Sequence, residues 1–150
     1  MRAFLPAMVI LASLSPRITP GQATTPVASD SARLQGTWKM VSGAVGGEAM
    51  PATYLAAMRR TLTGNALTIM RGSQIFFQAT IQLDPSHLPK TIDYHMTTGP
   101  TAGSIQRGIY RIAGDTVYFC FAGVNADRPL EFKTSPGDGR TLSVWLPLRP

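Results

Sequence analysis

Apolar and polar residues alternate along many short segments of this chain, and turn residues separate the segments. The clearest alternation covers residues 75–83, where every second side chain is apolar and those between are mostly polar. A period of two is the side-chain period of a β-strand, and one apolar face indicates a sheet that packs that face on a core. The 14 Gly and 12 Pro among 150 residues suit short strands joined by turns better than a helical bundle.

The same pattern predicts further strands and a single helix. Gly64 with Asn65, and Gly114 with Asp115, mark the turns of two hairpins. One helix is predicted over 51–60, with Tyr54, Leu55 and Met58 as its buried stripe. Strands are expected at 36–42, 61–63, 66–70, 75–83, 91–96, 105–112, 116–122, 130–133 and 142–146. We therefore expect an all-β, mainly antiparallel, up-and-down β-barrel of eight or nine strands with one short helix.

The N-terminus has the pattern of a cleaved secretion signal. Arg2 precedes an apolar stretch over 3–14, which has the length of a signal-peptide core and is too short to span a bilayer. Gly21 and Ala23 supply the small residues of a cleavage site before Thr24. We expect a signal peptide (1–23), a disordered leader (24–32) and one folded domain (33–150). The protein is then secreted or periplasmic, with no membrane span in the mature chain.

The charge is basic but dispersed. The formal net charge is +6, and loss of Arg2 and Arg17 with the signal would leave +4. Only Arg59 and Arg60 are adjacent basic residues. A nucleic-acid binder usually gathers its charge on one face, so we expect no nucleic-acid partner.

A series of short motifs covers nearly all of the mature chain, from residue 33 to 148. The motifs are 34–43, 47–51, 62–69, 83–86, 89–93, 108–110, 114–116, 120–122, 128–129 and 131–132. Their order and spacing resemble those of a planctomycete family of small secreted lipocalin-like domains of unknown function. The resemblance implies a signal peptide and a lipocalin-like barrel, and it implies no activity, ligand or catalytic residue. The Gly36-x-Trp38 element is also similar to the first strand of lipocalins, where the Trp helps to close one end of the barrel.

The alternation also predicts which side chains face the barrel interior. An eight-stranded barrel of this kind is either just filled by side chains or holds one small ligand, and the sequence leaves both open. Trp38 should plug the closed end beside the last strand, where Arg149 would stack on its indole. The predicted inward residues are Trp38, Met40, Ile75, Phe77, Ile81, Leu83, Tyr110, Ile112, Val117, Phe119, Phe121, Leu130, Phe132, Leu142 and Val144.

The sequence contains no group of residues typical of a catalytic or metal site. Asp93 and His95 share a strand face, but zinc needs three or four ligands and the other histidine, His87, falls in a turn. Ser104 lacks the Gly-x-Ser-x-Gly surroundings of a nucleophile elbow. The single cysteine, Cys120, lies in an aromatic strand and should be a buried small hydrophobe. We expect no metal, no cofactor and no enzymatic activity.

Two function classes remain. The first is a secreted, non-enzymatic binding protein with a small hydrophobic ligand in the barrel mouth. The second is an extracytoplasmic protein-interaction or inhibitor module with a filled barrel, which would meet a protein partner through the apolar loop around 123–129. An open cavity favours the first class and a packed interior the second. The predicted ligand-binding residues are Trp38, Met40, Phe77, Tyr110, Phe119 and Phe121.

Overall fold

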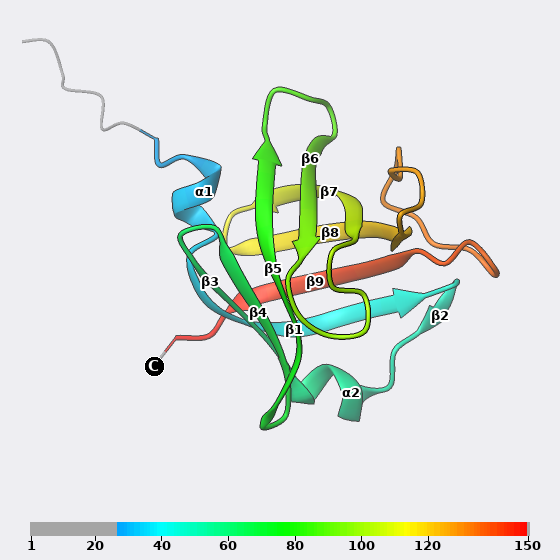
Figure 1. Cartoon of the computed structure of the whole chain (residues 1–150). Helices are drawn as coiled ribbons and strands as arrows, with labels where there is room; N and C mark the ends of the chain where they lie inside the picture. Colours follow the sequence, from blue (N-terminus) through cyan, green and yellow to red (C-terminus); the bar gives the residue numbers. More distant parts are fainter. Residues whose placement is uncertain (1–26, 150) are drawn as a thin grey trace, which may run out of the picture.

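The computed structural model of the protein describes residues 27–149, and the predicted signal peptide lies outside them. The described chain forms nine strands and two short helices (Figure 1). In chain order they are α1 (Asp30–Arg33), β1 (Gly36–Val45), β2 (Glu48–Ala49), α2 (Ala52–Ala57), β3 (Met58–Thr63), β4 (Ala66–Arg71), β5 (Gln74–Asp84), β6 (Lys90–Met96), β7 (Ile105–Ala113), β8 (Thr116–Val124) and β9 (Thr141–Pro147).

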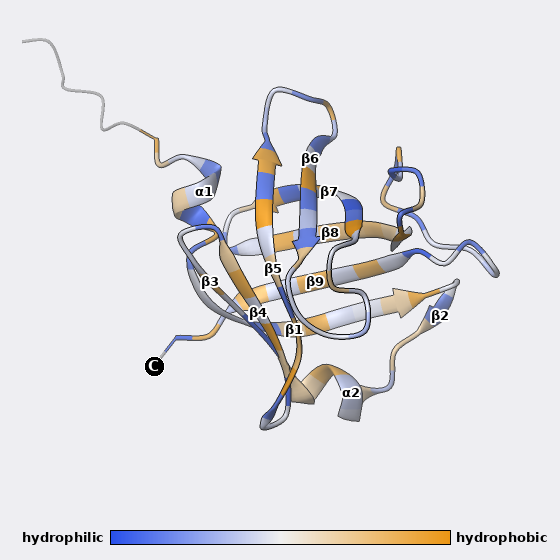
Figure 2. Ribbon diagram, in the orientation of Figure 1, coloured by the Kyte–Doolittle hydropathy of each residue, from blue (hydrophilic) through white to orange (hydrophobic). Residues whose placement is uncertain are grey.

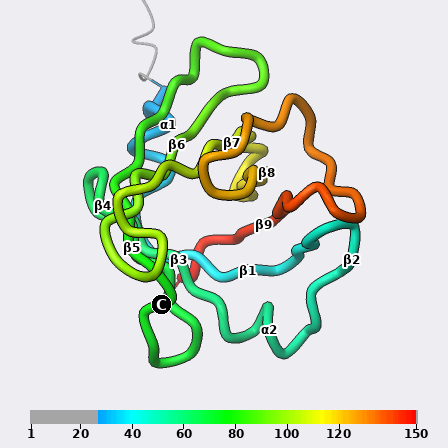
Figure 3. Tube along the Cα trace, turned by 45° about the vertical axis from the view of Figure 1, so that its right-hand side comes forward, coloured from blue at the N-terminus to red at the C-terminus, as the bar shows by residue number. Residues whose placement is uncertain are grey.

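Eight of these strands form a closed antiparallel barrel. From β3 to β9 each strand pairs with the next one along the chain, and β1 pairs with both β3 and β9. Figures 1 and 3 show β1 and β9 side by side where the barrel closes. The two-residue strand β2 only extends the edge of β1. The prediction of an up-and-down all-β barrel is therefore confirmed, and the architecture is consistent with a lipocalin-like fold.

Local sequence explains the strands and their turns. Figure 2 shows hydrophobic and hydrophilic residues alternating along several ribbons, and in β3, β4 and β6 every second residue is buried. Gly64 adopts a φ of +61° in the two-residue turn between β3 and β4. That conformation is open to glycine and is what the first position of a type II′ hairpin turn requires.

The predicted helix is shorter than expected. It ends at Ala57, and the chain enters β3 at Met58. Arg59 and Arg60, which the sequence placed in the helix, pair instead with β1 and β4. Two neighbouring strands satisfy more backbone groups here than one further helical turn would, so tertiary pairing overrides helix propensity.

The predicted strand at 130–133 is absent, and segment 125–140 runs irregularly between β8 and β9. Leu130 is 82% exposed, so it does not face the interior. Arg128 anchors this segment to the outer wall, since it donates hydrogen bonds to the carbonyl oxygens of Ile92 and Gly108 and forms a 2.7 Å ion pair with Asp93.

Two further inward assignments are wrong in β9. Ser143 and Trp145 are buried, whereas Leu142 and Val144 are half-buried. Ser143 and Trp145 pair with Phe119 and Val117, which face the core, so they share the inner side of the barrel. Apolar residues occupy both faces of β9, and the alternation could not choose between them.

Two more predicted inward residues lie elsewhere. Ile75 is 55% exposed, because β5 extends beyond the barrel core at its start. Phe132 belongs to segment 125–140, and its ring lies 5.7 Å from the Arg111 guanidinium. Most of the remaining set is confirmed as buried: Trp38, Met40, Ile81, Tyr110, Val117, Phe119 and Phe121 are in the core, with Phe77, Leu83 and Ile112 packed against it.

One end of the barrel is sealed by α1 and the residues after it. Ser29 caps this helix by accepting a hydrogen bond from the Ala32 amide, so ordered structure begins within the predicted disordered leader. The buried Trp38 donates its indole N–H to the Leu34 carbonyl oxygen at 3.0 Å. The plug position of Trp38 at the end where β9 finishes is thus as expected.

The predicted stacking of Arg149 on Trp38 is wrong. Arg149 forms an ion pair with Asp115 at the turn between β7 and β8. An exposed carboxylate gives the guanidinium a partner without the loss of water that stacking on a buried indole would require.

Candidate functional site

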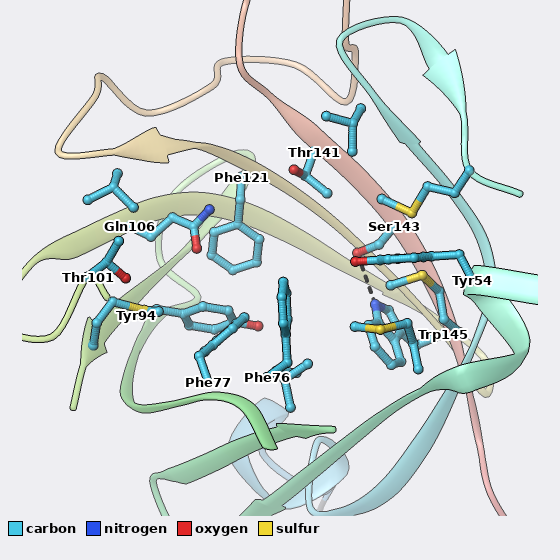
Figure 4. A pocket seen from close by; sticks show the side chains of 17 residues that line it. Tyr54, Phe76, Phe77, Tyr94, Thr101, Gln106, Phe121, Thr141, Ser143 and Trp145 are labelled. Carbon is cyan, nitrogen blue, oxygen red and sulfur yellow. Dashed lines mark hydrogen bonds between the residues drawn. The ribbon is translucent and has the colours of Figure 1, made fainter. Parts of the chain in front are cut away.

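The other end of the barrel contains a cavity of about 380 Å³ (Figure 4). This volume lies at the small end of the range of about 300–1,000 Å³ found for small-molecule sites. The lining side chains come from most barrel strands, from α2 and from the loop between β6 and β7. They are Met40, Val45, Met50, Tyr54, Met58, Ile69, Phe76, Phe77, Tyr94, Met96, Thr101, Gln106, Phe121, Val124, Thr141, Ser143 and Trp145.

One wall of the cavity is a continuous series of aromatic rings. The Phe77 and Tyr94 ring centroids are 6.1 Å apart, and those of Tyr94 and Phe121 are 4.2 Å apart. Phe76 follows on the other side of Phe77, at 5.6 Å. Consecutive residues of a strand normally face opposite sides, but the β4–β5 register shifts here and leaves Phe76 as the extra, unpaired residue. This bulge turns both phenyl rings of the pair toward the cavity.

The opposite wall is rich in methionine. Met40, Met50 and Met58 lie on or near β1 and β3, whereas Met96 adjoins the aromatic series on β6. Methionine is unbranched and polarizable, so it adapts to irregular apolar shapes. A rigid aromatic wall faces a deformable one, which suits ligands that vary in outline.

Few polar groups reach the cavity. The Trp145 indole N–H donates to the Ser143 hydroxyl at 2.9 Å (Figure 4). The Gln106 amide donates to the Ala122 carbonyl oxygen at 3.0 Å. The hydroxyl groups of Tyr54 and Tyr94 point into the open space in the same view. None of the lining residues carries a charge. Such a surface favours an apolar body with one or two hydrogen-bonding groups.

Gly108 on β7 makes room for one of the aromatic rings. A Cβ atom at this position would lie 2.5 Å from Cδ1 of Phe121. The ring therefore packs directly against the strand backbone, which leaves the centre of the barrel free.

Arg60 lies inside the barrel, below the cavity. Its side chain is 1% exposed, and Nε, Nη1 and Nη2 have no hydrogen-bond partner. Its Cζ atom lies 4.8 Å from the centroid of the Phe119 ring. A cation–π contact of this kind contributes about 0.5–2 kcal/mol. Burial of an unpaired charge costs several kcal/mol, so the contact offsets only part of it.

The structure divides the six predicted ligand-binding residues into two groups. Met40, Phe77 and Phe121 line the cavity, whereas Trp38, Tyr110 and Phe119 lie in the filled half of the barrel. A pattern of alternation predicts that a side chain faces inward, but not how far along the barrel axis it lies. That position depends on strand tilt and stagger, which a local pattern does not contain. The alternation of Ile92, Tyr94 and Met96 could have identified Tyr94 and Met96. Nothing local pointed to Arg60, Trp145 or the bulged Phe76.

The polar residues considered from the sequence are engaged on the outside. Asp93 pairs with Arg128, and His87 lies 3.1 Å from Asp84. Ser104 bonds to the Thr101 carbonyl oxygen. Between residues 27 and 149 no three His, Cys, Asp or Glu side chains are grouped as metal ligands.

Comparisons with family models, with curated proteins and with solved structures found no match to the chain. Within the described part of the chain, no helix has the length and apolar character needed to cross a membrane.

Proposed function

We propose that this protein is a non-enzymatic binding protein that holds a small, mainly apolar ligand in the open half of its barrel. The observation that carries the proposal is the 380 Å³ cavity, whose lining combines aromatic rings, methionines and a few polar groups without a charge. A filled barrel, which the alternative function would need, is found only in the half around Trp38.

The two tryptophans make a direct test available. Trp145 lines the cavity and Trp38 lies in the sealed half. Bromine quenches indole fluorescence on contact, so 1-bromooctane should quench Trp145 but not Trp38. The measurement is a fluorescence titration of two matched single-tryptophan variants, Trp38→Phe and Trp145→Phe.

Saturable quenching in Trp38→Phe, with little change in Trp145→Phe, would support the cavity as the binding site. Equal quenching in both variants, or none in either, would reject it.

A protein-interaction or inhibitor module is the second candidate. It is favoured by Leu88 and Leu130, whose side chains are 99% and 82% exposed outside the barrel. This function needs no cavity ligand. It becomes the leading one if bromooctane does not bind.

We also propose that the domain acts after export, on the basis of the signal-like pattern over 1–23. N-terminal sequencing of the exported protein should begin at Thr24. An intact Met1 on protein retained in the cytoplasm would reject this proposal.

A further inference from the structure

Two consecutive arginines of β3 have opposite environments. Arg59 faces outward and donates hydrogen bonds to the carbonyl oxygens of Ala56 and Met58. Arg60 faces inward between the buried Met58 and Leu62, and none of its three nitrogens has a partner. A guanidinium does not lose its proton in a protein, so Arg60 is a buried positive charge.

The protein supplies no side-chain counterion for this charge. The chain has eight Asp and Glu residues, all within the described part. Five of them bond to other groups: Asp30 to Lys90, Asp84 to Ser86, Asp93 to Arg128, Asp115 to Arg149, and Asp138 to Thr134 and the backbone. The remaining three, Glu48, Asp127 and Glu131, are exposed.

The unpaired guanidinium lies one layer of side chains below the cavity. Met58, two residues away on the same face of β3, lines the cavity. Ile69, which is the partner of Arg60 on the neighbouring strand β4, lines it as well. The Phe119 ring beneath the guanidinium stacks at 5.9 Å on Phe121, which also lines the cavity. The side chains of Met58 and Arg60 are both long and unbranched, so each has other rotamers available that can bring the charge nearer to the cavity floor.

We propose that the ligand of this cavity is an amphiphilic carboxylate, whose acid group pairs with Arg60 and whose apolar body fills the space between the aromatic and methionine walls. The inference rests on the proposed binding function and specifies its ligand class. The planar fork of a guanidinium matches a carboxylate with two parallel hydrogen bonds. Because the protein already buries Arg60, an ion pair with the ligand requires little further burial of the arginine.

The test compares decanoate with 1-decanol, which has the same chain length and no charge. Affinities are measured on the full protein by competition with bromooctane and by calorimetry at neutral pH. Wild type should bind decanoate at least tenfold more tightly than decanol. In Arg60→Met, which keeps the length of an apolar stem, this preference should disappear while decanol still binds. The control Arg59→Met removes a neighbouring charge from the outer surface and should leave the preference unchanged.

The outcomes separate the inference from the function it rests on. Equal affinities of wild type for both compounds, or a decanoate preference that survives Arg60→Met, would overturn the carboxylate assignment and leave the cavity as a binding site. Failure of decanol, decanoate and bromooctane alike would reject the binding function itself. A preference that falls in Arg59→Met or vanishes in 0.5 M NaCl would assign decanoate to the basic outer surface, because a buried pair is little screened.

Arg60→Lys provides a second variant should Arg60→Met not fold. It retains the charge and loses the fork, so the preference for decanoate should fall at least threefold. If Arg60→Lys prefers decanoate over decanol as strongly as wild type does, the proposed pair of parallel hydrogen bonds between the guanidinium and the carboxylate would be overturned.

Discussion

The two ends of the barrel are built from the same strands but differ in what their interiors contain. At the sealed end, α1 covers the opening, and Leu34, Leu62 and Trp38 are almost fully buried. Asp30 on this helix accepts hydrogen bonds from Lys90 at 2.6 Å and from the Tyr110 hydroxyl at 2.9 Å. At the open end α2 and the loop between β6 and β7 contribute side chains to a cavity, and four of its lining residues are methionines.

The difference indicates a division of tasks along the barrel axis. Close packing at the sealed end stabilises the fold, since packed interiors lose several kcal/mol for each large side chain removed. The hydrogen bonds of Asp30 to Lys90 and Tyr110, called the latch below, add to this stability. The open end leaves apolar surface without a partner, which lowers stability but provides a binding surface. Arg60 lies at the boundary between the two halves.

The largest effect on stability is expected from Trp38→Ala at the sealed end. Removal of a buried aromatic side chain costs about 3–5 kcal/mol, a large share of the stability of about 5–15 kcal/mol of a small domain. The measurement is the urea midpoint of unfolding. A small shift would show that the sealed end is not the stable half.

Gly108→Ala should disturb the open end. The new Cβ would lie 2.5 Å from Phe121, and the ring must then move toward the cavity. We expect a cost of about 1–3 kcal/mol from overpacking, together with weaker bromooctane binding. Gly123→Ala is the matched control, because its Cβ would only meet the Gly139 carbonyl oxygen at 3.8 Å. Unchanged binding in Gly108→Ala would mean that Phe121 does not shape the cavity.

Asp30→Asn should weaken the latch of the sealed end in a pH-dependent way. Burial raises the pKa of Asp30, but the hydrogen bonds and charge of Lys90 and the Tyr110 hydroxyl outweigh it, so the pKa lies below its usual value. A carboxylate with a lowered pKa contributes stability above its unfolded pKa of about 3.9, and this contribution is lost as the pH falls through the folded pKa.

The variant should therefore be less stable than wild type at pH 7, by about 1.5 kcal/mol for a charge-assisted hydrogen bond. The difference should shrink as the pH falls below the unfolded pKa and through the lowered folded pKa of Asp30, because the carboxyl group then becomes uncharged like the asparagine amide. A series of urea midpoints from pH 7 downward measures it. A difference that does not depend on pH would exclude an ionic latch.

The smallest effect is expected from Arg149→Ala. Its ion pair with Asp115 joins side chains that are 71% and 67% exposed. Exposed pairs contribute about 0–1 kcal/mol, so the urea midpoint should hardly move. A loss of stability close to that of Trp38→Ala would contradict an exposed ion pair as the main interaction of Arg149.

The sequence predicted the barrel well because alternation is a local property. The hairpin at Gly64 and the long strand β5 follow from period-two patterning and turn chemistry. The alternation was ambiguous in β9, where both faces carry apolar residues, and the predicted helix ended early because β3 had two strands to pair with. Only three of the six predicted ligand-binding residues line the cavity, since strand stagger sets how far along the barrel axis an inward side chain lies.

The order of apolar and polar residues thus determined by itself that this chain forms an antiparallel barrel with Trp38 inside it. Only the tertiary structure decided that one half is filled and the other hollow. It also decided that, of two adjacent arginines, Arg59 meets solvent and Arg60 the core. The physical reason is that a strand pattern specifies a face, whereas an empty space or an unpaired charge depends on which side chains from distant strands meet there.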